Sequence, residues 1–209
     1  PRGPLSSRAP AGGRAFPTLT DRSHVSKPQP DQDGMSAPRP LSNLSWPFRG
    51  GDVGDIGKEG RFVATTIAAA GPDELVARVD CVCICSSDIK IIRMGAAHAL
   101  FRDRDLAAAP MVLGHELAVT LVDVGANWRH RYRQGQRLGL QPAVFVGGQR
   151  RTIGFDLPGG LSRFIRLDPT LLDGDLKPYL FDAPPELSGA AIALLEPYAC
   201  VEAAFRPNS

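Results

Sequence analysis

The sequence predicts a mainly β protein with helices at its periphery, folded into a closed or partly closed barrel. Two observations carry this prediction. Beyond residue 60, turns rich in Gly and Pro divide the chain into short stretches in which apolar residues alternate, as in half-buried strands. Helical spacing of apolar residues is confined to a short segment after residue 86 and a longer one near the C-terminus. Many short strands with few helices are typical of barrels.

The expected strands follow one another along the chain with turns between them. Alternation or a short apolar run predicts strands at Phe62–Ile67, at Leu75–Val79 continuing into Cys81–Cys85, at Met111–Leu113, at Leu117–Val124 and at Gly159–Leu167. Gly71-Pro72 and Gly125-Ala126-Asn127 mark turns. Two stretches fit no period, a polar excursion at 95–110 and a segment at 147–157, and both are predicted to be irregular.

Capping residues and a proline predict where the helices begin and break. Ser86-Ser87-Asp88 are N-cap types that precede Ile89–Arg93, so a short helix should begin there and end near Gly95. Residues 186–205 carry apolar side chains at helical spacing. Pro197 lies inside that segment, where its ring and its missing N–H should kink or divide the helix.

Residues 1–50 differ in composition from the rest of the chain. They hold nine prolines, five glycines, seven serines, and seven Lys or Arg against three Asp and no Glu. Such a segment buries too little surface to offset its chain entropy, so we predict a disordered Pro/Ser/Arg-rich leader or linker. A transit peptide, an added leader before a native start at Met35, and a plain linker all fit this composition. Residues 51–209 are the predicted folded domain.

The overall composition is that of an ordinary globular chain. Hydrophobic residues make up 43% of it, and the formal net charge is +2. This charge gives no reason to expect a nucleic-acid partner, and no apolar run in the sequence reaches membrane-spanning length. We therefore expect neither a nucleic-acid nor a membrane partner. The expected location is the cytoplasm, or an organellar matrix if the N-terminal segment is a transit peptide.

The four cysteines do not look like a secreted disulfide framework. Cys81, Cys83 and Cys85 alternate along one predicted strand and should face the same side. Cys81, Cys83 and Cys200 are predicted to be small buried apolar residues. Only Cys85 is a candidate ligand for a metal.

The segment Met111–Val119 organises the candidate site. An apolar run ends at Gly114, whose missing Cβ allows a sharp turn that leaves His115 and Glu116 at the edge of a cavity. An imidazole beside a carboxylate suits a divalent metal, above all zinc. The dipeptide alone is weak support, and it gains force from Cys85 and Glu196 elsewhere in the chain.

Each of these residues also has an ordinary structural interpretation. Cys85 fits a buried thiol, and His115 fits a core histidine with its hydrogen bonds satisfied. Glu196, which precedes a proline, fits a surface residue. Ser87 and Asp88 fit a simple N-cap pair. The metal-site interpretation is favoured because the residues occur together.

Seven segments, in this order, resemble the medium-chain dehydrogenase/reductase superfamily, which contains the zinc-dependent alcohol and polyol dehydrogenases. They are residues 73–79, 85–88, 110–116, 124–125, 135–138, 159–161 and 195–197. Together they span nearly all of the predicted folded domain. Within the superfamily the chain looks closest to reductases of the sorbitol dehydrogenase and sorbose-1-phosphate reductase kind.

The resemblance implies a GroES-like barrel that carries a catalytic zinc. Cys85 matches the first zinc ligand of the family and His115 the second. Glu116, and at longer reach Glu196, match the carboxylates that complete or exchange at the metal in the polyol branch. Three protein ligands with one open position are what a catalytic zinc requires.

Two further matches imply catalytic roles. Ser87 matches the hydroxyl residue that hydrogen-bonds the substrate oxygen and starts the proton relay. Asp88 looks like the carboxylate that orients the ligand histidine. The implied activity is hydride transfer between NAD(P) and a small alcohol, polyol or sugar phosphate, with zinc polarising the substrate hydroxyl or carbonyl. A homo-oligomer is a further expectation.

The sequence departs from the resemblance in two ways. Residues 140–160 contain no cysteine, so only one zinc is expected. No Gly-x-Gly-x-x-Gly turn occurs, so the usual Rossmann domain has no counterpart, and NAD(P) would bind only through that missing second domain. We therefore expect the chain alone to be inactive. The alternative is a non-catalytic GroES-like structural or binding module. A zinc-free quinone or enoyl reductase is disfavoured by the complete ligand set.

Overall fold

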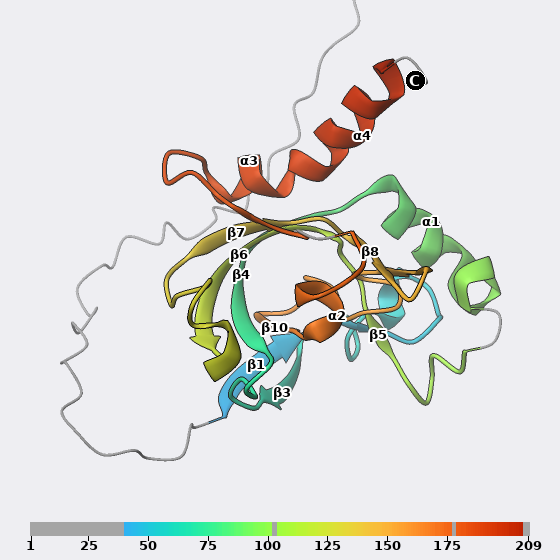
Figure 1. The fold of residues 1–209 in the computed structure, drawn as a ribbon. Helices are drawn as coiled ribbons and strands as arrows, with labels where there is room; N and C mark the ends of the chain where they lie inside the picture. The colour runs from blue at the N-terminus through green and yellow to red at the C-terminus, as the bar shows by residue number, and fades with distance from the viewer. Residues whose placement is uncertain (1–39, 102–103, 177–178, 207–209) are drawn as a thin grey trace, which may run out of the picture. The chain divides into compact units, whose positions relative to one another are not determined.

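The computed structural model describes residues 40–101, 104–176 and 179–206 (Figure 1). Its largest sheet has five antiparallel strands in the order β10-β4-β6-β7-β11. These strands are β4 (Leu75–Cys83), β6 (Glu116–Val124), β7 (Arg137–Leu140), β10 (Phe164–Leu167) and β11 (Leu180–Asp182). The pairing of β4 with β6 shifts register after Val76 and after Val79, and such bulges bend a strand pair.

Three two-stranded ribbons complete the described β structure. They pair β1 (Leu41–Ser45) with β3 (Val63–Ile67), β2 (Pro47–Phe48) with β5 (Met111–Val112), and β8 (Ala143–Val146) with β9 (Gln149–Thr152). A bridge between Ser45 and Ser162 connects the first ribbon to the segment that leads into β10. The predicted mainly β fold class is confirmed: short antiparallel strands dominate, and the helices lie outside them (Figure 1).

The helices are short and few. The α-helices are α1 (Ser86–Met94), α2 (Pro169–Leu172), α3 (Gly189–Ala193) and α4 (Leu195–Phe205). Single 3₁₀ turns are η1 (Val53–Asp55), η2 (Gly95–Ala97), η3 (Ala99–Phe101) and η4 (Ala126–Trp128). Helix α1 begins and ends where the sequence predicts, since Cys85 is its N-cap and Gly95 its C-cap. Among the described residues, no helix is both long enough and apolar enough to span a membrane.

Three apolar clusters hold these elements together, and the smallest packs Ile192 and Ala193 of α3 against Ala118 of β6. The main core lies among the strands and includes Leu75, Leu117, Leu121 and Leu138. The second core packs β2, α1 and β5 against the segment at 95–110; its buried members are Phe48, Ile91, Phe101, Leu106, Met111 and Leu113. The excursion at 95–110 is therefore not merely polar. Its apolar residues are too widely spaced to give a period, yet two of them are fully buried.

Truncating Leu106 should test whether the excursion contributes to stability. Leu106 is 2% exposed, whereas Leu100 in the same segment is 54% exposed. Leu106→Ala should lower the free energy of unfolding by about 2–5 kcal/mol, as for other buried leucines. Leu100→Ala should change it by less than about 0.5 kcal/mol. Urea unfolding followed by circular dichroism measures both, and equal effects would mean that the segment is not packed as described.

The segment at 147–157 is more ordered than predicted. Its first part belongs to the β8–β9 hairpin, whose turn is Gly147-Gly148 with φ values of 56° and 72°. The sequence analysis missed this hairpin because arginines occupy much of β9. Conversely, only Phe164–Leu167 of the expected strand at 159–167 is β10. A Cβ at Gly159 would clash with the backbone of Leu113 and Gly114, and a Cβ at Gly160 would clash with the side chain of Leu117.

The boundary at residue 50 is wrong for the last part of the N-terminal segment. Leu41–Ser45 form β1 and pair in register with Val63–Ile67, and Pro47–Phe48 form β2. The buried face of β1 carries the polar residues Asn43 and Ser45, so no apolar alternation marks the strand in the sequence. The prediction of disorder for residues 1–39 lies outside the described residues and stays a prediction.

The C-terminal helical segment divides as Pro197 suggests, and the break falls just before it. Helix α3 ends at Ala193 and α4 begins at Leu195, because Pro197 has no N–H to donate four residues back. Helix α3 buries Ile192 and Ala193, but α4 buries none of its residues. Its large exposed apolar side chains are Leu195, Tyr198, Val201 and Phe205.

Two expectations about the cysteines need correction. Strand β4 ends at Cys83, so Cys85 lies outside the strand and does not continue its alternation. Cys81 and Cys83 are half-buried against α3, as small apolar residues would be, but Cys200 is exposed. The prediction fails for Cys200 because α4 buries none of its residues.

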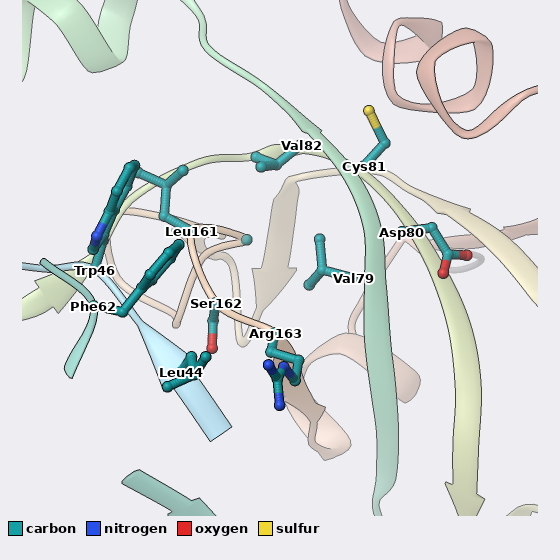
Figure 2. Close-up of a pocket in the computed structure, with 11 residues that line it drawn as sticks. Leu44, Trp46, Phe62, Val79, Asp80, Cys81, Val82, Leu161, Ser162 and Arg163 are labelled. Atoms are coloured by element: carbon teal, nitrogen blue, oxygen red, sulfur yellow. The ribbon is translucent and has the colours of Figure 1, made fainter. Parts of the chain in front are cut away.

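A cavity of about 440 Å³ lies between the β1–β3 ribbon and β4 (Figure 2). The rings of Trp46 and Phe62 are stacked at its edge, with centroids 4.7 Å apart. Val79 and Leu161 line it further, while the sulfur of Cys81 points away from it (Figure 2). Its lining is mostly apolar and includes none of the candidate metal ligands.

Candidate metal centre

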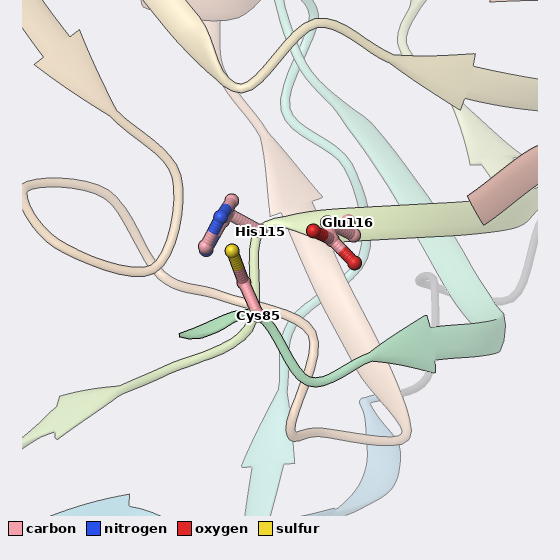
Figure 3. Close-up of side chains that lie close together, drawn as sticks. All are labelled: Cys85, His115 and Glu116. Carbon is pink, nitrogen blue, oxygen red and sulfur yellow. The ribbon is translucent and has the colours of Figure 1, made fainter. Parts of the chain in front are cut away.

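Three of the predicted ligands lie together. Cys85, His115 and Glu116 each offer one ligand atom, and these atoms lie within 4.8 Å of one another (Figure 3). Cys85 lies between β4 and α1, while His115 and Glu116 lie at the beginning of β6. The centre therefore joins two segments that are 30 residues apart in the chain. His115 and Glu116 are 6% and 4% exposed, and Cys85 is half-buried.

Gly114 provides the turn that places the histidine. Its φ is +91°, a conformation that L side chains rarely adopt, and a Cβ there would lie 2.8 Å from Cγ2 of Val82. The carbonyl of Gly114 accepts a hydrogen bond from the N–H of Gly160, and Leu113 accepts one from Leu161. The expectation of a sharp turn at Gly114 is confirmed, and its neighbours explain why no larger residue fits.

Asp88 connects the two segments that carry the ligands. Its side chain is fully buried in the first turn of α1. Its carboxylate accepts hydrogen bonds from the N–H of Cys85 at 3.0 Å and from the N–H of Gly114 at 3.4 Å. Oδ1 of Asp88 lies 3.5 Å from Nδ1 of His115. One buried carboxylate thus contacts the backbone of Cys85, the backbone just before His115, and the ring of His115.

The surroundings of His115 favour positive charge. Burial lowers the pKa of its imidazole, but the interaction with Asp88 and the neighbouring Cys85 outweigh burial and raise the pKa from 6.5 to about 9. The separation of 3.5 Å is long for a hydrogen bond, and Nδ1 is buried without a well-formed partner. A thiol, an imidazole and a carboxylate are a fitting donor set for zinc, and the imidazole must release its proton to ligate the ion.

The two remaining predicted site residues are Ser87 and Glu196. Ser87 is half-buried in the first turn of α1, two residues after Cys85. Glu196 is half-buried in the first turn of α4 and accepts a hydrogen bond from Sγ of Cys200 at 3.3 Å. It is not a member of the three-residue group.

Cys200 shows that α4 approaches the same centre. Its pKa is raised by the hydrogen bond to Glu196, by burial, and by the charges of Glu196, Cys85 and Glu116. Cys200 is thus electrostatically coupled to two members of the metal group. The sequence gives no signal for this, because Cys200 follows Glu196 in a helix whose position depends on tertiary structure.

Phe155 is a neighbour of the centre that sequence analysis missed. Its ring lies over His115, with centroids 5.1 Å apart and planes at 52°. The residue belongs to the stretch that fits no period, so nothing in the sequence distinguishes it from other loop residues.

Comparisons with known proteins identify the domain that carries this centre. Residues 71–172 match the family model described as the alcohol dehydrogenase GroES-like domain. L-sorbose 1-phosphate reductase of Klebsiella pneumoniae is 29% identical over 150 residues, which are 71% of this chain and 35% of the reductase. Sorbitol dehydrogenase of Gallus gallus is 36% identical over 93 residues, 44% of this chain and 23% of the dehydrogenase.

Solved structures have the same fold. The 2R,3R-butanediol dehydrogenase of Bacillus subtilis superposes with a TM-score of 0.58 at 24% identity, over 76% of this chain and 45% of that one. An Escherichia coli oxidoreductase of unknown specificity gives 0.60 at 20% identity, over 80% and 49%. The chain spans about a third of the length of the Klebsiella reductase. It belongs to the medium-chain dehydrogenase/reductase superfamily and carries the alcohol dehydrogenase GroES-like domain.

Proposed function

We propose that this chain supplies the zinc-binding half of the active site of an alcohol, polyol or sugar-phosphate dehydrogenase. The observation that carries the proposal is the group Cys85, His115 and Glu116, whose ligand atoms lie within 4.8 Å of one another in a GroES-like domain. Three protein ligands leave a fourth position for substrate, which is typical of catalytic rather than structural zinc.

The protein's own residues would hold and orient the ion. Cys85, His115 and Glu116 would ligate it, and Glu196 would exchange with Glu116 from α4. A bound zinc would supply Lewis acidity toward the substrate hydroxyl or carbonyl oxygen. Asp88, 3.5 Å from His115, would fix the orientation of the imidazole and increase its basicity as a ligand.

Ser87 is the proposed proton relay. Its hydroxyl lies two residues from Cys85 and is half-buried, so it can contact both substrate and solvent. A hydroxyl donates and accepts at once, and can therefore pass the substrate proton outward without carrying charge itself. This role needs no strong base in the centre.

The substrate class and the redox cofactor follow from the relatives. Those named above act, by name, on L-sorbose 1-phosphate and sorbitol, and two solved structures of the same fold were determined with NADP and with NADH. We infer a polyol or sugar-phosphate substrate. We also infer NAD(P) as the hydride acceptor, bound by a second domain of the Rossmann type.

Zinc titration of the metal-free chain tests the proposal. We expect about one zinc per chain, as for a single catalytic site. Substitution by Co(II) should give a thiolate-to-cobalt charge-transfer band, which reports the cysteine ligand. A chain that binds no zinc at neutral pH and gives no such band would overturn the proposal and favour a structural or binding module with a GroES-like fold.

A further inference from the structure

We propose that Arg104 and Phe155 form a latch that holds the imidazole of His115 in its ligating orientation. The inference rests on the proposed zinc site but assigns new roles, because neither residue offers a metal ligand. Both are positioning residues that act through His115. Three contacts carry the argument: a ring on the histidine, a turn fixed against the adjacent backbone, and an arginine that anchors the turn.

The first contact restrains the histidine ring. The rings of Phe155 and His115 are tilted by 52° with centroids 5.1 Å apart, a favoured geometry for aromatic pairs. Phe155 also packs against the second core, so the ring is supported from behind. With Asp88 near Nδ1 and Phe155 on its face, the imidazole is restrained from two directions.

The second contact fixes the turn that carries Phe155. The carbonyl of Thr152 accepts hydrogen bonds from the N–H groups of Phe155, Asp156 and Leu157. The carboxylate of Asp156 accepts one from the N–H of Thr152 in return. This turn is therefore closed on itself and can move only as a unit.

The turn is also seated on the backbone next to His115. Gly154 has a φ of +79°, and a Cβ there would lie 3.1 Å from both the nitrogen and the oxygen of Gly114. Two glycines with positive φ thus meet backbone to backbone, immediately before the histidine. A displacement of the turn would move Phe155 and would also separate Gly154 from the backbone of Gly114.

The third contact anchors the turn to a distant segment. Nη1 of Arg104 donates a hydrogen bond of 2.5 Å to the carbonyl of Phe155, across 51 residues of sequence. The guanidinium lies over the ring of Phe101, 5.5 Å from its centroid, and Phe101 is buried in the second core. The N–H of Arg104 donates to the carbonyl of Phe101 at 2.9 Å. Arg104 is itself exposed, but its guanidinium lies on a buried aromatic ring, and a charged donor makes a strong hydrogen bond.

The latch should raise the affinity for zinc, because holding the histidine ring in its ligating orientation lowers the entropy lost on binding. An imidazole that can rotate loses entropy when it binds a metal, whereas a restrained one has lost it already. Groups that support a ligand histidine from outside typically change metal affinity by 10–100-fold. We expect the low end of that range for the latch, about tenfold, because Asp88 remains in place.

Two variants and two matched controls test the latch. Arg104→Gln removes the charged donor, and Phe155→Ala removes the ring. Arg133→Gln, at an exposed arginine between η4 and β7, and Phe62→Ala, at the ring stacked on Trp46, change the same residue types outside the latch. Zinc affinity should fall about tenfold in the first pair and stay within about twofold in the controls. Phe155→Tyr keeps the ring and should restore the affinity.

A second measurement needs no metal. In the metal-free protein, amide hydrogen exchange at Phe155–Leu157 should become at least about tenfold faster in Arg104→Gln, because the turn loses its anchor and opens more often. The Co(II) spectrum of Phe155→Ala should also show altered ligand-field bands, which a general loss of stability would not produce.

The outcomes separate the latch from the zinc site. Unchanged exchange at Phe155–Leu157 in Arg104→Gln would overturn the latch, whether or not the chain binds zinc. Faster exchange in Arg104→Gln, with zinc affinity and the Co(II) spectrum unchanged in the variants, would overturn the proposal that the latch orients the imidazole of His115. A wild-type chain that binds no zinc would contradict the proposed function, and the exchange measurement would still decide whether Arg104 anchors the turn.

Discussion

Cys85→Ser is expected to abolish stoichiometric zinc binding. The substitution replaces a thiolate, a strong zinc ligand, with a hydroxyl that stays protonated at neutral pH. Changes outside the ligand shell alone cost 10–100-fold in affinity, so loss of a ligand should cost more than about 100-fold. Elemental analysis of the purified variant, together with a competition titration against a chromogenic chelator, measures this.

Cys83→Ser is the matched control. Cys83 is also half-buried and lies two residues earlier, but it is not a member of the three-residue group. Its pKa is raised, first by burial and then by Cys81 and Glu116, so it stays a thiol. Zinc content should be retained in this variant. Equal losses in both variants would mean that the thiols act on packing rather than on the metal.

Asp88→Asn is expected to weaken zinc binding by about 10–100-fold, the range for groups that orient a ligand histidine. The amide has nearly the same shape but carries no charge, so it is a weaker acceptor for the N–H of the neutral imidazole that ligates zinc. The N–H groups of Cys85 and Gly114 would then share one remaining acceptor oxygen. Zinc dissociation constants measured by competition give the ratio directly.

Asp80→Asn is the control that tells whether Asp88→Asn acts by losing the orientation of His115 or simply by removing a negative charge. Asp80 pairs with Arg78 and accepts a hydrogen bond from Thr120. It belongs to β4 but contacts no candidate ligand, so its loss should leave zinc affinity within about twofold, since screened surface charges contribute little. A drop in Asp80→Asn as large as in Asp88→Asn would contradict the positioning role of Asp88.

Local chemistry explains which parts of the site could be predicted. Gly114-His115-Glu116 combines a backbone requirement with two donor side chains, and the structure brings Cys85 to the same pair. Asp88 carries two signals at once, as an N-cap type and as a carboxylate near a thiol. Each of these features acts within a few residues, so sequence spacing reports it.

The features that could not be predicted depend on distant packing. Phe155 and Arg104 meet only because the turn after β9 rests on Gly114. Leu106 is buried by elements on both sides of it in the sequence, without any periodic pattern of its own. The exposure of Cys200 depends on what covers α4, which apolar composition cannot reveal.

Glu196, the proposed exchange ligand, lies in a helix that should have low local stability. The helix has 11 residues, buries none of them, and makes only sparse contacts with α3 and β6. Helices of this length are marginal in water without tertiary contacts, so α4 should open at little cost in free energy. Glu196 occupies its first turn. Recruitment of this carboxylate by a cation would therefore also be a local folding event, in which the ion fastens the helix and part of the binding free energy is consumed in ordering it.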